Sequence, residues 1–417
     1  MNERRLSYPS KNFHAEIELP KSKSISNRLL MIKALSNEQL PLKNLSQAND
    51  TILLHKILNQ TLNTSSEKIE INAQDAGTVY RFLTAYLATK EGEWFLTGSK
   101  RMLQRPIGIL VNALRSLGSD IEYANQEGFP PLHIHGKKLS STELSIDSHT
   151  SSQFITAILL ISPYLTNGLK INLKQKPSSL PYIDMTIKMM QDFGISIHRD
   201  KQTIHIKEGK YSNREYIVEA DWSAAAFWYQ TVAFSNKGSL LLKNLKLNSI
   251  QGDSILPTIF EQLGVKTSIK SNGILIEKTN NIKQNITLDF NQHPDIAMPI
   301  INTCAGLGVI GKFSGLESLK IKESNRIEVL ESELTKLGFD FRETDENEWI
   351  LINSCSPSTN EHNFSSISID TFDDHRVAMS FAPFAILGKS INIKHPEVVI
   401  KSYPNFWLEF NKLTIFA

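Results

Sequence analysis

The sequence predicts an α/β protein with two similar domains, on three observations: a repeated helix pattern, a repeated helix-to-strand junction and the chain length. At about 150 residues per domain, 417 residues fit two or three domains. The chain is 41% apolar and 21% charged, and 45 Lys and Arg against 43 Asp and Glu leave a net charge of +2. This is a globular composition. The near-neutral balance argues against a nucleic-acid or membrane-surface protein, which would carry a broad basic excess.

The helix pattern consists of helix-length apolar runs rich in small residues, each starting at a polar residue or glycine. The runs begin at Lys23, Gly77, Ser151, Asp221, Asp295 and Asp374. Successive starts lie 54 to 79 residues apart. We expect these runs to form buried helices. Pro299 and Pro383 lie inside the last two runs and weaken the expectation there, because an interior proline kinks or breaks a helix.

The junction consists of an amphipathic segment that ends in glycine and continues into alternating apolar and polar residues. Its glycines are Gly118, Gly194, Gly264 and Gly338. Glycine just past a helix is a common left-handed C-cap, and the alternation after it is typical of a strand. Periodicity of this length indicates one supersecondary unit used about six times. Two domains of three units, divided near Glu219–Ala220, are the simplest arrangement, with surface loops at 139–152 and 354–366.

Cysteine content and hydropathy restrict the class of protein further. Cys304 and Cys355 are 51 residues apart without CxxC spacing, which supports neither a disulfide framework nor a structural zinc site. The first residues hold no apolar signal segment, and no apolar run reaches the 18 to 20 residues of a membrane span. We therefore expect a soluble cytoplasmic protein.

Residues able to bind anions lie where the apolar runs begin. A helix N-terminus presents free N–H groups and a positive dipole end. The Ser and Asp residues at these starts could equally be ordinary N-caps. Arg28, Arg81 and Arg376 are harder to explain in this way, because a charge in an apolar run is costly unless it is paired or functional.

Other basic residues lie in short polar patches. They are Arg105, Lys322, Arg326 and Lys401. With Lys23, Arg28 and Arg376 they could surround a multiply anionic substrate in a cleft between two domains, since Arg and Lys both suit phosphate and carboxylate groups. Asp295 and Glu323 are the acids best placed for proton transfer near such cations.

One glycine-rich run imitates a nucleotide-binding motif. Gly306–Phe313 matches both GxGxxG and GxxxxGK, but Phe313 stands where a P-loop needs Ser or Thr after the lysine. The run also follows an apolar helix and leads towards a strand. We therefore expect a helix end and a turn here.

Ten segments, in order and with suitable spacing from about Glu16 to Phe406, resemble the 5-enolpyruvylshikimate-3-phosphate synthase family. They are LPKSKSISNR, DAGTVYRFLTA, RPI, SSQFITAIL, LPYIDMT, QGD, PDIAM, KESNRI, DDHRVAM and KSYPNF. The resemblance implies two inverse α/β domains, each of three βαβαββ repeats, with the active site in the interdomain cleft. It also implies that a strand at about Phe13–Leu19 joins the C-terminal half. The domains would then be 1–19 with 220–417, and 20–219.

The resemblance implies a transferase of the shikimate pathway to chorismate and aromatic amino acids. The reaction moves the enolpyruvyl group of phosphoenolpyruvate to the 5-hydroxyl of shikimate 3-phosphate and releases phosphate. It implies no metal or organic cofactor, and partners limited to these two small molecules, with no nucleic acid or membrane. A cytoplasmic monomer is expected.

Site residues follow from the matching motifs. Those implied for shikimate 3-phosphate are Lys23, Ser24, Arg28, Ser151, Ser152, Gln153, Ser179, Tyr182, Asp295 and Lys322. Those implied for phosphoenolpyruvate are Lys23, Gly77, Arg105, Gln153, Arg326, Arg376 and Lys401. Asp295 would be the base on the hydroxyl and Glu323 the proton donor to the methylene carbon. Lys23 is an alternative proton carrier, and His375 would tune Glu323.

Four positions depart from the family pattern. Lys21 replaces a glycine of the first loop, Asp75 an asparagine, Asn325 an aspartate, and Ser318 an asparagine that often contacts the shikimate phosphate. We expect these changes to affect substrate affinity and inhibitor response more than reaction type. Gly77 predicts sensitivity to glyphosate, a competitor of phosphoenolpyruvate.

Two alternatives remain at this stage. The sister enolpyruvyl transferase acting on UDP-N-acetylglucosamine typically has Asn after the first-loop lysine and a reactive cysteine on a mobile loop. Here Ser24 follows Lys23, and Cys304 lies in an apolar run. A non-catalytic anion-binding protein on the same scaffold would be expected to have lost Asp295, Glu323 or several cations, and all are present.

Overall fold

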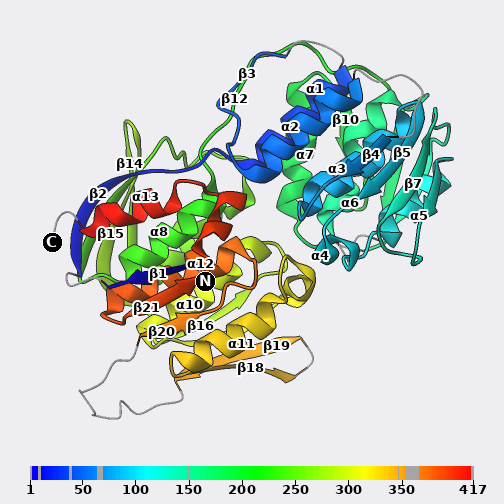
Figure 1. Ribbon diagram of the computed structural model, residues 1–417. Coiled ribbons are helices and arrows are strands. Elements are labelled where there is room, and N and C mark those ends of the chain that lie inside the picture. Colours follow the sequence, from blue (N-terminus) through cyan, green and yellow to red (C-terminus); the bar gives the residue numbers. More distant parts are fainter. Residues whose placement is uncertain are drawn as a thin grey trace. The chain divides into compact units, whose positions relative to one another are not determined.

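The computed structural model describes residues 2–7, 11–36, 40–62, 69–147, 151–175, 177–345, 347–353 and 366–414. They form two compact units (Figure 1). The N-terminal unit is Ser22–Val218, and the C-terminal unit combines Met1–Lys21 with Glu219–Ala417. The sequence analysis placed these boundaries at 19/20 and 219/220.

Each unit alternates helices and strands. The elements of the N-terminal unit are α1 (Lys23–Ser36), β3 (Leu42–Lys43), α2 (Asn49–Leu62), β4 (Ile69–Asn72), α3 (Gly77–Thr89), β5 (Gly92–Thr97), α4 (Lys100–Leu103), α5 (Gly108–Ser116), β6 (Asp120–Tyr123), β7 (Leu132–Gly136), β8 (Glu143–Ile146), α6 (Ser152–Ile161), η1 (Ser162–Tyr164), β9 (Leu169–Leu173), α7 (Leu180–Asp192), β10 (Ile197–Arg199), β11 (Thr203–Ile206) and β12 (Tyr216–Ile217). In this list and the next, η marks a 3₁₀ helix.

The C-terminal unit repeats the alternation. Its elements are β1 (Glu3–Leu6), β2 (Asn12–Glu18), α8 (Trp222–Phe234), β13 (Lys237–Lys243), η2 (Gly252–Ile255), α9 (Leu256–Glu261), β14 (Leu263–Lys270), β15 (Gly273–Ile282), β16 (Asn285–Asp289), η3 (Pro294–Ile296), α10 (Ala297–Leu307), β17 (Ile310–Ser314), η4 (Glu317–Ile321), α11 (Arg326–Lys336), β18 (Phe339–Asp345), β19 (Glu348–Asn353), β20 (Ile367–Ile369), α12 (His375–Phe381), η5 (Ala382–Leu387), β21 (Ile391–Lys394), η6 (Pro396–Lys401), α13 (Phe406–Asn411) and η7 (Lys412–Thr414).

One sheet pattern occurs twice in each unit. The strand orders are β4-β5-β7-β6 and β8-β9-β11-β10 in the N-terminal unit, and β2-β13-β15-β14 and β16-β17-β19-β18 in the C-terminal unit. In each sheet the first pair is parallel and the other pairs are antiparallel. A parallel pair needs a helical crossover, whereas the antiparallel pair closes directly. This is the βαβαββ repeat.

The third repeat of each unit is shorter and joins distant parts of the chain. In the N-terminal unit β12 pairs in parallel with β3, far earlier in the sequence. In the C-terminal unit β20 pairs in parallel with β21, and β1 adds an antiparallel strand. The sequence analysis did not anticipate β1.

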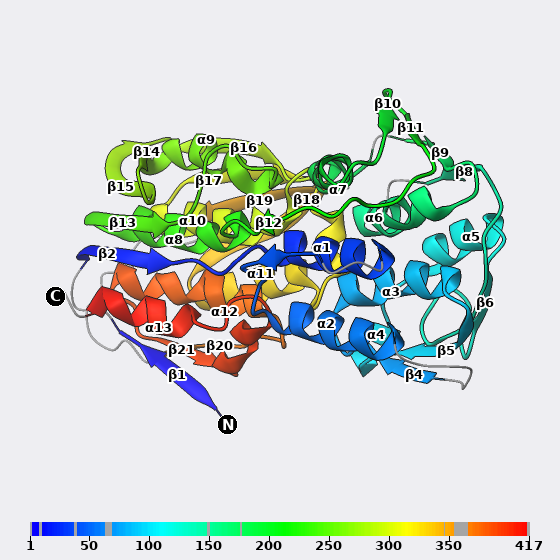
Figure 2. The same cartoon turned by 90° about the horizontal axis from the view of Figure 1, so that it is seen from above.

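The strand β2 belongs to the C-terminal unit, as the family resemblance implied. It runs parallel to β13 from Asn12 opposite Lys237 to Glu18 opposite Lys243, and the two strands lie side by side in Figure 2. Its alternate residues Phe13, Ala15 and Ile17 are buried. Alternation of this kind fits a strand with one face on the core.

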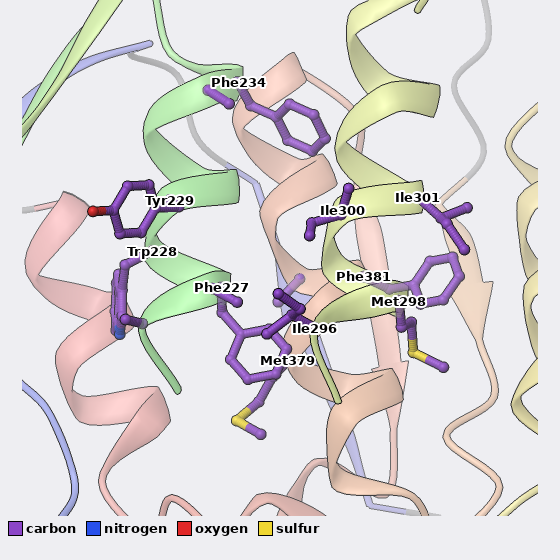
Figure 3. Close-up of a cluster of buried hydrophobic side chains, with 14 of the residues drawn as sticks. Phe227, Trp228, Tyr229, Phe234, Ile296, Met298, Ile300, Ile301, Met379 and Phe381 are labelled. Carbon is purple, nitrogen blue, oxygen red and sulfur yellow. The ribbon is translucent and has the colours of Figure 1, made fainter. Parts of the chain in front are cut away.

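The predicted apolar runs form the inner helices of each unit. Helices α1, α3 and α6 pack on one another in the N-terminal unit, and α8, α10 and α12 do so in the C-terminal unit. Each begins within two residues of its predicted start. Figure 3 shows aromatic and aliphatic side chains of α8, α10 and α12 meeting in the core, including Phe227, Ile300 and Phe381. Small residues allow such close approach of helices, and a helix that is apolar all round must be buried.

The two prolines have different effects. Pro299 is the third residue of α10, where its missing N–H breaks no helical hydrogen bond, so α10 is continuous. Pro383 lies where α12 gives way to the 3₁₀ helix η5. The expected sixth helix is therefore only seven residues long as an α-helix.

Glycines and loops complete the comparison with the sequence. The four junction glycines have φ of 96°, 89°, 79° and 89°, all left-handed as predicted. Gly308 caps α10 at φ 73° and β17 follows. The glycine-rich run Gly306–Phe313 is therefore the end of a helix and a turn, as predicted, and not a nucleotide-binding loop. The expected loop 139–152 contains β8, which corrects the sequence analysis: the strand has only four residues and lies between polar runs that obscure the alternation of Leu144 and Ile146. Residues 354–365 of the other expected loop lie outside the described residues. Within the described part, no helix is both long and apolar enough to span a bilayer.

Candidate active site

Arg28 is the central cation of the N-terminal unit. Helix α1 buries its side chain to 3% exposure. Its guanidinium donates to the hydroxyls of Thr186 and Thr156, at 2.8 and 3.3 Å, and to the carbonyls of Ser24 and Tyr182, at 2.9 and 3.1 Å. No carboxylate within the described ranges pairs with it, and burial lowers the pKa of Arg28 to about 10. A buried charge that meets only neutral acceptors is suited to receive an anionic ligand.

Two further cations of this unit, Arg81 and Arg105, flank Gly77 at the start of α3. Arg81 Nη1 donates to the Gly77 carbonyl at 2.9 Å. Arg105 is 5% exposed, and its buried Nε has no hydrogen-bond partner in the described part of the chain. A Cβ built on Gly77 would lie 2.5 Å from Arg105 Nη1 and 2.7 Å from Arg81 Nη1. Two guanidinium groups and a helix N-terminus therefore converge where only glycine leaves room.

The other predicted residues of this unit lie at the starts of α1, α6 and α7. Lys23 Nζ pairs with Asp50 Oδ2 at 2.8 Å. Ser151 caps α6 by accepting from the Gln153 N–H at 3.3 Å, so the N-cap interpretation holds for it. Gln153 Nε2 in turn donates to Thr78 Oγ1 at 3.1 Å, which links α6 to α3.

The remaining two serines are buried. Ser152 is the first residue of α6, and Ser179 precedes α7 in the left-handed conformation, with φ of 54°. Tyr182 lies in the first turn of α7, and its carbonyl also accepts from Thr186 at 2.7 Å. The structure thus joins Ser24, Arg28 and Tyr182 directly.

Asp295 is the central acid of the C-terminal unit. Its carboxylate lies 3.5 Å from Lys322 Nζ, 3.7 Å from Arg326 Nη1 and 3.4 Å from Arg376 Nη2. Arg376 also donates to the Asp295 carbonyl at 2.8 Å. Burial lowers the pKa of Lys322, although Asp295 opposes this. Four residues predicted from three separate motifs thus meet in one cluster.

Arg326 connects this cluster to two more acids. It is 1% exposed and makes a two-point contact with Asp374, at 2.7 and 3.2 Å, and a third contact with Glu323 at 2.8 Å. Burial raises the pKa of Asp374, but the charges of Arg326 and His375 and the hydrogen bond from Arg326 together leave that pKa below its ordinary value. His375 Nδ1 lies 3.7 Å from Asp374 Oδ1. The influence of His375 on Glu323 stays a prediction.

Lys401 is the last residue of η6, which packs against α12, the helix that carries Arg376. Lys401, which was implied for phosphoenolpyruvate, therefore lies on an element that adjoins the helix of Arg376.

Six residues of these clusters were absent from the predicted site. They are Asp50, Thr78, Arg81, Thr156, Thr186 and Asp374. Asp374 was interpreted as a possible cap, and it does accept from the Arg376 N–H at 2.9 Å. Its complete burial, with 0% exposure, was not anticipated. Nothing in the spacing of Thr156 and Thr186 links them to Arg28, because they lie 128 and 158 residues from it.

Comparison with known proteins identifies the family. The sequence model of the family described as EPSP synthase (3-phosphoshikimate 1-carboxyvinyltransferase) matches residues 7–410. The chain belongs to the EPSP synthase family. A 3-phosphoshikimate 1-carboxyvinyltransferase of Bacteroides fragilis strain YCH46 is 45% identical over 98% of this chain and 97% of that protein. Another from Pseudoalteromonas translucida is 33% identical over 96% of each chain.

Solved structures of EPSP synthase share the fold. An EPSP synthase from Acinetobacter baumannii aligns with a TM-score of 0.76 over 99% of this chain and 98% of that one, at 21% sequence identity. This likeness extends the two-domain α/β architecture to the whole chain.

Three departures from the EPSP synthase pattern have visible local consequences. Lys21 forms an isolated antiparallel bridge with Ala220. Asp75 accepts a short hydrogen bond from Ser99, the residue that caps α4. Asn325 precedes α11, and its buried Oδ1 has no partner among the described residues. The fourth, Ser318, lies in η4.

Proposed function

We propose that the chain transfers the enolpyruvyl group of phosphoenolpyruvate to the 5-hydroxyl of shikimate 3-phosphate and releases phosphate. Its family membership supports this reaction. The observation that carries it is Asp295, a carboxylate held among Lys322, Arg326 and Arg376. This arrangement provides a base surrounded by the cations that two anionic substrates require.

The charge of the substrates matches the available cations. Each substrate carries a phosphate and a carboxylate, so the pair brings roughly five to six negative charges. In the N-terminal unit, Lys23, Arg28 and the serines at the starts of α1, α6 and α7 would hold shikimate 3-phosphate. Gly77 and Arg105 would hold phosphoenolpyruvate, with Arg326, Arg376 and Lys401 from the C-terminal unit.

The chemistry requires two proton transfers in each direction. Asp295 would take the proton of the 5-hydroxyl as its oxygen bonds to C2 of phosphoenolpyruvate. Glu323, or alternatively Lys23, would protonate the methylene carbon, which gives a tetrahedral intermediate. The C–O bond to phosphate then breaks as the new methyl group returns a proton to the same group and Asp295 passes its proton to the departing phosphate, and this forms the enol ether of the product. The cations around Asp295 would stabilise the charge that develops on the phosphate.

Phosphate release tests the reaction. Purified protein should release phosphate from phosphoenolpyruvate with shikimate 3-phosphate, and not with phosphoenolpyruvate alone. UDP-N-acetylglucosamine as the acceptor provides the control for the sister reaction. Absence of release with shikimate 3-phosphate, or release supported only by the UDP-sugar, would overturn the proposal.

We also propose that the protein acts in the cytoplasm as a monomer. Light scattering after size-exclusion chromatography should give a mass near 47.1 kDa. A mass near twice that value would contradict the proposal.

A further inference from the structure

Asp253 is a buried acid that faces His293, two residues before Asp295. Asp253, from the QGD segment, lies in η2 and is 4% exposed. Its Oδ2 accepts a 2.5 Å hydrogen bond from Ser223 Oγ at the start of α8. Its Oδ1 lies 4.0 Å from His293 Nδ1, a buried nitrogen with no hydrogen-bond partner among the described residues. None of these residues has a role in the proposed reaction.

The two acids have opposite surroundings. Asp295 has three cations within 4 Å, whereas Asp253 has no Lys or Arg at that distance in the described part of the chain. The charged groups that act on Asp253 are Asp295, Asp221 and Arg376. Burial, reinforced by Asp295, raises the pKa of Asp253 to about 7, while Ser223 and Arg376 oppose the change. Burial also lowers the pKa of His293, which favours its neutral form. Pairs of acids held apart in this way commonly have different functions in one site.

The segment that carries Asp253 is rigidly held. Gln251 Nε2 donates to Glu219 Oε1 and to the Ala220 carbonyl, both at 2.8 Å, and its Oε1 accepts from the Trp222 N–H at 3.1 Å. Gln251 therefore ties η2 to the start of α8, which also supplies Ser223. The Asp253 carboxyl is held between Ser223 and His293.

We propose that Asp253 is a positioning residue for Asp295: the Asp253 carboxyl faces His293, two residues before Asp295, and its charge sets how strongly Asp295 binds the proton of the substrate hydroxyl. When Asp253 is ionised, its negative charge opposes that of Asp295 and offsets part of the Arg376 attraction. Both effects make Asp295 a stronger base. When Asp253 is protonated, Arg376 acts on Asp295 alone and weakens it. This inference rests on the proposed function, because it requires Asp295 to accept that proton.

Asp253→Asn and Ser223→Ala test the proposal through the pH dependence of kcat. Asn matches the shape of the protonated carboxyl, so Asp253→Asn should equal wild type within about twofold at pH 6 and fall about three- to tenfold below it at pH 8. Ser223→Ala removes the hydrogen bond that favours ionised Asp253, so it should move the rise in kcat to higher pH. Glu261→Gln, which removes an exposed acid from the adjoining α9, is the matched control and should follow wild type.

Wild type and all variants are assayed with the same substrates. The ionisation of the substrate phosphates near pH 6 therefore affects every profile equally. Differences between variants therefore report on the protein. A ratio of Asp253→Asn to wild type that stays constant from pH 6 to pH 8 would overturn the proposal, as would an unshifted Ser223→Ala profile. If Asp253→Asn does not fold, the Ser223→Ala profile decides alone. Failure of the proposed function is a different result: wild type itself would then release no phosphate with shikimate 3-phosphate.

Discussion

The two units bury arginines in opposite ways. In the N-terminal unit Arg28 meets two hydroxyls and two carbonyls, and no carboxylate of the described chain. In the C-terminal unit Arg326 is almost enclosed by the carboxylates of Asp374, Glu323 and Asp295. The first arrangement leaves a positive charge for a ligand to neutralise, and the second neutralises the charge within the protein.

This difference suggests a division of function between the units. A desolvated cation without a counter-ion costs several kcal/mol, which an anionic substrate offsets on binding. A cation among carboxylates attracts a further anion less strongly than an unpaired cation does, and it fixes the position and charge of those acids. The N-terminal cluster is thus suited to substrate binding, and the C-terminal cluster to proton transfer.

The largest expected effect is on turnover. Asp295→Asn should lower kcat about 10³-fold with a change in KM below about threefold, because it removes a general base and keeps the shape of the side chain. Steady-state phosphate release measures both constants. Asp289→Asn, an exposed acid at the end of β16, is the control. Near-normal turnover of Asp295→Asn would show that Asp295 is not the base and that the C-terminal cluster does not carry out this proton transfer.

The same substitution at the two buried arginines should have different effects on stability. Arg326→Met leaves Asp374 buried and unpaired, and should lower the free energy of unfolding by about 3–5 kcal/mol. Arg28→Met leaves only hydroxyls and carbonyls behind, and should be neutral within about 1 kcal/mol while shikimate 3-phosphate binds at least about tenfold more weakly. Urea unfolding and titration calorimetry measure the two quantities. Equal destabilisation by both variants would show that the arginines do not differ as described.

The buried acid Asp253 gives the C-terminal unit its own pH dependence of stability. Because its pKa is raised from 3.8 to about 7, Asp253 contributes stability below about pH 4 and loses it as pH rises through about 7. Asp253→Asn lacks this loss, so it should gain on wild type by about 2 kcal/mol between pH 5 and pH 8. Urea unfolding at the two pH values measures the gain, with Glu261→Gln as the control. A constant difference between Asp253→Asn and wild type would show that Asp253 ionises in its ordinary range.

The smallest expected effect is at Gly77. An alanine Cβ would meet Arg105 and Arg81 at 2.5 and 2.7 Å, so the guanidinium ends must shift by several tenths of an ångström. Gly77→Ala should therefore raise the KM for phosphoenolpyruvate by about two- to tenfold and weaken glyphosate inhibition more strongly, with an unchanged kcat. Ala76→Gly, one residue before α3, is the control: it also exchanges alanine and glycine at the start of this helix, but it adds no atom beside the two arginines. Unchanged inhibition in Gly77→Ala would argue against an anion site between the two arginines.

Much of the fold could be predicted from the sequence because the relevant signals are local. The inner helices are apolar all round, and their starts, such as Gly77 and Asp221, are visible in the sequence. The strands β1 and β8 were missed because each has only four residues, β1 being mostly polar and β8 lying between polar runs. Their partners β21 and β9 lie far along the chain or across a crossover, so pairing is not written in either segment.

For the candidate site, too, the residues with local signals could be predicted, but their surroundings could not. Arg28, Arg81 and Arg376 were noticeable as charges in apolar runs, and Asp295, Lys322 and Arg326 were found from their motifs. What surrounds each of them could not be predicted. Thr186 is 158 residues from Arg28, and Asp374 is 48 residues from Arg326.

The sequence by itself determined the repeat, the left-handed glycines and the residue types that bind anions, because each depends on neighbours within one or two helical turns. Only the tertiary structure decided which cations are neutralised and which are not. That outcome depends on burial and on contacts between distant segments, and these set the local electrostatic energy. Lys322 and Arg28 are both cations implied for shikimate 3-phosphate, yet one faces Asp295 and the other faces hydroxyls and carbonyls.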